Sequence, residues 1–135
     1  MKEITAGMIR REKSARASAL GELLPPITHV GWGDEGHDFD TGDPIVPSED
    51  ATSAYGEFLK KEIDNVEVNG NIVSILVTLL PDEGNGRNVS SCALYDADGD
   101  VVAISNFRPK SKTEDDTLTY KDNGLKFHIG ANKDQ

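Results

Sequence analysis

The chain has 135 residues, a formal net charge of −10 and a hydrophobic fraction of 36%, and this length suits one folded core rather than two. The acidic balance argues against a nucleic-acid partner, because binding to a phosphate backbone depends on clustered Lys and Arg. No stretch approaches the about 20 apolar residues of a membrane-spanning helix, and the N-terminus lacks the apolar centre of a signal peptide, so we expect no membrane contact and synthesis in a cytoplasm.

The first predicted element is a helix that ends near Leu20. Thr5 suits its N-cap and Gly21 suits the C′ position. Two stripes of apolar residues have helical spacing: Met8, Ala15, Ala19 and Leu23, or Ile9 and Leu20. Two prolines at 25–26 then force extended backbone into a predicted strand over residues 27–33.

Residues 34–47 are rich in Gly, Asp and Pro without periodicity, which predicts a long surface loop. Its one imidazole, His37, and its carboxylates could hold a divalent cation, but no recognised ligand spacing is present, so we expect a solvated acidic loop and no metal. Residues 34–64 hold ten acids, whereas residues 1–16 are mainly basic. These two charged parts could attract one another between subunits, or each could be a solvated face. After the loop we expect a short helix capped near Ser48, which leads into the next strand.

The strongest pattern is a hairpin around Asn69-Gly70, the pair preferred in a type I′ turn. If the turn centres there, Val66 pairs with Val73. The residues expected on the core face are Val66, Val68, Val73, Ile75, Val77 and Leu79. Two further hairpins are predicted, one around Asp96–Asp100 within residues 89–107 and one around Asn123-Gly124. Between them, residues 108–116 could be a flexible arm.

Asp96, Asp98 and Asp100 imitate the start of a calcium-binding loop. The sixth position is Val101 rather than Gly, and the twelfth is Phe107 rather than Glu, so the match fails and a hairpin turn explains the three aspartates. Cys92 is the only cysteine, so no internal disulfide is possible and a buried, inert thiol is expected.

The sequence gives no positive support for catalysis. His29, His37 and His128 are scattered, no serine has a Gly-x-Ser-x-Gly context, and no Gly-rich phosphate cradle is present. We therefore predict no enzyme activity and no cofactor. The indole of Trp32 could be an exposed interface anchor or core filling. As interface candidates we name Trp32, Tyr55 and Phe58.

Several short motifs, taken in order, resemble the N-terminal domain of bacteriophage tail-collar fibre proteins. They are Ile4–Gly7 at the start of a helix, Ile27–Asp34, Pro44, Pro47, Tyr55–Phe58, Lys61–Ile63 and the hairpin Ala93–Phe107. This resemblance implies a structural protein of the virion tail, the domain by which a usually trimeric fibre attaches to the baseplate. It also implies other tail or baseplate proteins as partners, and a homo-oligomer.

The loop over residues 35–43 is more charged than the Gly/Thr/Pro-rich loop expected of that family. Because the family's domain commonly heads a longer fibre, a free-standing tail or baseplate protein and a fibre both remain open. We predict an α+β fold in which an N-terminal helix packs on a mainly antiparallel sheet built from successive hairpins. One domain over residues 1–130 would precede a frayed tail, 131–135. The alternative is a small carbohydrate- or cation-binding module that uses Trp32 and the acidic loop.

Overall fold

The structure is a computed structural model that describes residues 2–4, 8–69, 72–80, 82–83, 85–111, 116–121 and 124–129. The predicted tail, 131–135, and the predicted N-cap, Thr5, lie outside these ranges. Within them the chain forms one helix and nine strands: β1 Lys2–Ile4, α1 Met8–Leu20, β2 Ile27–Gly33, β3 Glu57–Glu62, β4 Asn65–Asn69, β5 Ile72–Leu79, β6 Asn88–Asp96, β7 Val101–Ser111, β8 Asp116–Lys121 and β9 Gly124–Ile129. The predicted α+β class is confirmed.

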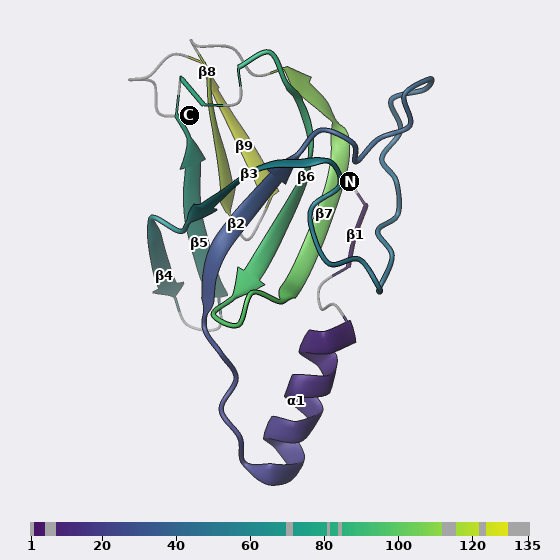
Figure 1. Cartoon of the computed structure of the whole chain (residues 1–135). Helices are drawn as coiled ribbons and strands as arrows, with labels where there is room; N and C mark the ends of the chain where they lie inside the picture. Colours follow the sequence, from purple (N-terminus) through teal and green to yellow (C-terminus); the bar gives the residue numbers. More distant parts are fainter. Residues whose placement is uncertain are drawn as a thin grey trace.

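The strands form two antiparallel sheets, and α1 projects from one end of them (Figure 1). One sheet has the order β1-β7-β6-β2-β3 and the other β4-β5-β8-β9. One of two buried clusters in the described ranges draws side chains from both sheets, including Val30, Trp32 and Cys92 from the first and Val77 and Leu79 from the second. The apolar residues therefore pack two layers face to face, as in a β-sandwich.

The first predicted hairpin is confirmed, but its register differs from the expected one. Val66 pairs with Ile75, not with Val73, which pairs with Val68. Because this shift is by two residues, every side chain stays on its predicted face. Of the expected core face, Ile75, Val77 and Leu79 are buried, while the other three side chains lie outside what the structure describes.

The second and third hairpins are also confirmed. In the second, β6 pairs with β7, and β7 continues to Ser111, so the first residues of the predicted flexible arm are strand instead. The reason is that the pairing extends past the predicted end, since Asn88 is opposite Ser111. In the third, Lys121 of β8 is opposite Gly124 of β9.

The predicted short helix near Ser48 is wrong. Residues 48–56 contain no helix, and strand β3 follows them. Two of their backbone donors bind distant side chains in place of helical carbonyls: Ala54 N donates to Tyr95 Oη and Tyr55 N donates to Ser91 Oγ. Gly56, with a φ of 65°, would also interrupt a helix here.

Helix α1 ends as predicted, but it does not pack through either apolar stripe. Gly21 has a φ of 74° and donates its N–H to Ala17 O, which is the expected C-terminal geometry. No residue of α1 is buried, and Leu23, just beyond it, is 95% exposed. A helix of 13 residues is marginal alone in water, so its position depends on the polar contacts described next.

Candidate functional site

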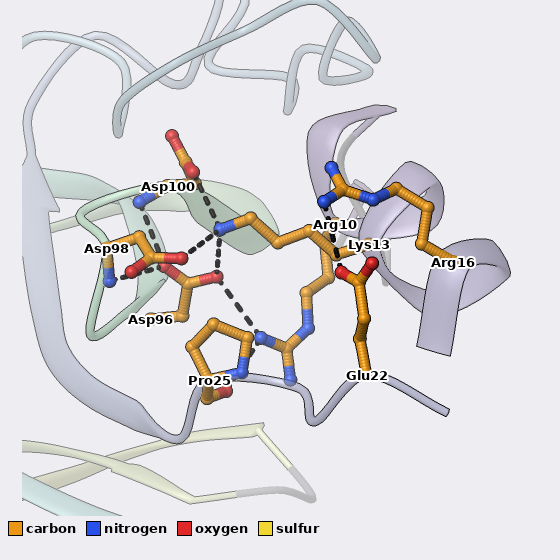
Figure 2. A network of polar contacts seen from close by, with 8 residues as sticks. All are labelled: Arg10, Lys13, Arg16, Glu22, Pro25, Asp96, Asp98 and Asp100. Carbon is orange, nitrogen blue, oxygen red and sulfur yellow. Dashed lines mark hydrogen bonds and ion pairs between the residues drawn. The ribbon is translucent and has the colours of Figure 1, made fainter. Parts of the chain in front are cut away.

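A cluster of charged side chains joins α1 to the turn between β6 and β7 (Figure 2). Lys13 Nζ donates to Asp96 Oδ2 at 3.0 Å, to Asp98 Oδ2 at 2.9 Å and to Asp100 Oδ2 at 2.7 Å. Arg10 donates to Asp96 Oδ2 at 3.1 Å and to Pro25 O at 2.8 Å. We refer to Arg10, Lys13, Asp96, Asp98 and Asp100 together as the α1 clamp.

The sequence forms the clamp from two local patterns. Arg10 and Lys13 are three residues apart, so they share one face of the helix. On the other side Asp96 N donates to Asp100 O and Gly99 N donates to Asp96 O, and Gly99 has a φ of 88°. This tight turn brings the three carboxylates within 4.8 Å of one another.

Asp96 is the central acceptor of the clamp, because it pairs with both Arg10 and Lys13. Its side chain is fully buried. Its Oδ1 accepts the N–H groups of Asp98 and Asp100, while its Oδ2 faces the two cations. Burial opposes the charged form of this carboxyl, but the hydrogen bond from Lys13 and the two from backbone N–H groups outweigh it and lower the pKa of Asp96.

The ammonium of Lys13 shows the complementary shift. Partial burial disfavours its charge, yet the hydrogen bonds to Asp100, Asp98 and Asp96 prevail and raise the pKa of Lys13 well above its ordinary value. Both partners of the central contact are therefore charged over a wide pH range. The sequence predicts the three aspartates as a turn but gives no signal of the clamp, because Lys13 and Asp96 are 83 residues apart.

The acidic loop is anchored to the sheet by a buried pair. His37 is 8% exposed, and its Nδ1 lies 2.7 Å from Oγ of Ser90, a fully buried residue that also accepts the N–H of Gly36. Asn106 Nδ2 holds the loop further along by donating to Ile45 O. These contacts show that part of the predicted solvated loop is packed against β6 and β7.

Three carboxylates of this loop also have partners. Asp34 pairs with Arg87 at 3.0 Å and Asp43 pairs with Arg108 at 2.5 Å. Asp38 accepts the N–H groups of two residues that follow it, which lowers its pKa. Among the residues that the structure describes, three acids converge as possible cation ligands in the α1 clamp but not in this loop.

The three interface candidates have different surroundings. Trp32 is 0% exposed and belongs to the core cluster, so of the two predicted roles core filling holds in this structure, and its indole cannot stack on a sugar. Tyr55 and Phe58 are half-buried. Tyr55 accepts the N–H of Ser48, and the guanidinium of Arg87 lies 5.1 Å from the centre of the Phe58 ring.

The remaining candidate groups have separate environments. His29 Nδ1 lies 2.8 Å from Thr28 Oγ1, whereas His37 contacts Ser90, so these two imidazoles have different partners. The side chain of His128 lies outside the described residues. Cys92 is buried, as predicted, and burial raises the pKa of its thiol.

The family of the chain follows from comparison with known proteins. The model of the family described as "Phage tail-collar fibre protein, N-terminal" matches residues 4–132, which is nearly the whole sequence. The chain belongs to this family, whose members are structural proteins that interact with other phage tail proteins. No curated protein and no solved structure matches the chain significantly. No helix in the described ranges has the length and apolar character needed to span a membrane.

Proposed function

We propose that the chain is an assembly and attachment module that links a phage tail fibre to the baseplate. The match of the family model over residues 4–132 carries this proposal. The distribution of apolar residues supports it, because one core cluster is used to hold two sheets together. The module would act by burying surface against its partners, without chemical turnover, and its place would be the virion tail after synthesis in the host cytoplasm.

The proposal includes a homo-oligomer, and a trimer is one state to test because the fibres of this family are usually trimeric. Surface features are consistent with several interfaces. Large apolar residues are exposed on and after α1, as with Leu20 at 69% and Leu23 at 95%, and on the acidic loop, where Phe39 is 75% exposed. Tyr55 and Phe58 are further interface candidates at the edge next to that loop.

The test combines a measurement of mass in solution with a co-sedimentation assay. We expect the purified chain to be oligomeric at high concentration and to sediment with phage tails that lack their own copy of it. A protein that stays monomeric and binds no tail component would contradict the proposal. A saturable heat of binding in calorimetry on addition of calcium or sugars would instead favour the carbohydrate- or cation-binding alternative.

A further inference from the structure

A groove opens beside the α1 clamp, between the start of α1, the segment over residues 49–52 and the β6–β7 turn. Its volume is about 250 Å³. Met8 and Ile9 of the helix, 48% and 44% exposed, form one wall, and Ala51 and Val101 lie opposite. This volume is below the about 300–1,000 Å³ of small-molecule sites, so the groove fits one or two protein side chains rather than a metabolite.

The rim of this apolar groove is acidic, with Glu49, Asp50 and Asp100 among its residues. Glu49 is neutralised by Arg11 at 2.9 Å, and Asp100 shares Lys13 with two other carboxylates. Within the described part of the chain, Asp50 has no ion-pair partner. The carboxylates around the groove therefore outnumber the cations, so a positively charged partner is favoured there.

This charge also disfavours two strongly exposed apolar side chains of a second copy, Leu23 and Phe39, as the occupant. The exposed loop residue Phe39 is flanked by Asp38 and Asp40, and Leu23 follows Glu22. Either side chain would bring more negative charge to an acidic rim, and like charges at an interface are unfavourable. A different protein with basic residues next to an apolar one has the complementary chemistry.

We propose that this groove binds a bulky apolar side chain, flanked by Lys or Arg, from a basic segment of another tail protein. The inference rests on the proposed function and specifies where on the surface a partner docks. Burial of the apolar side chain against Met8, Ile9 and Val101 would provide affinity. The rim carboxylates would select basic flanks and reject acidic ones.

The direct test uses three short synthetic peptides as probes and follows backbone amide signals by NMR. The first is acetyl-Gly-Arg-Leu-Lys-Gly-amide, the second has Glu and Asp as flanks, and the third has Ser in place of Leu. We expect the first peptide to shift the amide signals of Ala51 and Val101 saturably. The other two should bind at least about five-fold more weakly, since the second lacks the basic flanks and the third lacks the apolar side chain. No saturable shift up to about 10 mM, or an equal response to the acidic peptide, would overturn the proposal.

Two variants connect the groove to assembly. Thr52→Arg places a long cation in the groove at an exposed position, and Ser18→Arg makes the same change on the exposed part of α1, away from it. We expect Thr52→Arg to lose peptide binding and most co-sedimentation with tails, while Ser18→Arg keeps both. If the wild-type chain and Thr52→Arg join tails equally, the groove proposal fails and the attachment function stands. If the wild-type chain does not join tails, the attachment function itself fails.

Discussion

The substitution Lys13→Ala tests whether the α1 clamp alone holds the helix on the sandwich. Lys13 is 18% exposed and contacts three carboxylates. Its removal leaves those carboxylates within 4.8 Å of one another with Arg10 as the nearest remaining cation. Since no residue of α1 is buried, we expect the helix to detach while the two sheets stay folded.

The size of the effect follows from the burial of each partner. A hydrogen bond to a charged group contributes about 1.5–3 kcal/mol, and the bond to buried Asp96 falls at the low end because Arg10 still pairs with that carboxylate. The contacts to Asp98 and Asp100 are more exposed, and such pairs contribute about 0.2–1 kcal/mol each. We therefore expect a loss of about 2 kcal/mol, which corresponds to about a 30-fold change in the docking equilibrium.

Hydrogen exchange followed by mass spectrometry separates local from global loss. In Lys13→Ala the amides of residues 8–20 should exchange about 30-fold faster, while those of β6 and β7 should be nearly unchanged. Arg16→Ala is the matched control, because the Arg16–Glu22 pair is 63% and 45% exposed and should contribute under about 1 kcal/mol. If α1 and the sheet lost protection together in Lys13→Ala, or if α1 lost none, the reasoning would be refuted.

Three further predictions concern acid, packing and the thiol. The pKa of Asp96 is lowered from 3.8 in the folded protein, so the stabilisation that this carboxylate gives to docked α1 is present above pH 3.8 and is lost as the pH falls through the lower folded pKa. A hydrogen-exchange series should therefore show α1 detaching only in acid below pH 3.8. Detachment at neutral pH would contradict this. Gly31→Ala should destabilise the fold by about 1–3 kcal/mol in urea denaturation, since a Cβ there would lie 1.8 Å from Glu57 Oε1. Adding Glu57→Ala should restore part of the lost stability. An unchanged stability of the single variant would disprove the close approach. Cys92 should react with a thiol reagent about 100-fold or more slowly in the folded protein than in urea, because it is fully buried, and equal rates would show that the strand is exposed.

The hairpins could be predicted from the sequence because their information is local. Two turn residues between two runs of alternating apolar and polar residues specify both the partner strand and the buried face, as with Val77 and Leu79. The centre of the turn is less local: Asn69 pairs with Ile72 and so belongs to strand β4 rather than to the turn, which moves the partner of Val66 from Val73 to Ile75. The predicted core face is unchanged, since a two-residue shift keeps every side chain on the same face of the sheet.

The division into two sheets and the clamp could not be predicted, because both depend on contacts between distant residues. Strand β2 lies between β3 and β6, and neither pairing is signalled by a short turn. The apolar spacing after Ser48 predicts a helix, but the structure has none there, because Tyr95 and Ser91 accept backbone N–H groups of this segment. Local propensity is a weak guide when tertiary contacts satisfy the backbone in another way.

The clamp and the groove share structural elements, and this links the two proposals physically. Asp100 accepts a hydrogen bond from Lys13 and also borders the groove. Met8 and Ile9 form the opposite wall but lie on a helix that has no buried residue. The shape of the groove therefore depends on the charge pairs that position α1, rather than on the core of the sandwich. A partner that fills the groove would contact α1 and the β6–β7 turn at once, and would add apolar burial to a helix that has no buried residue of its own.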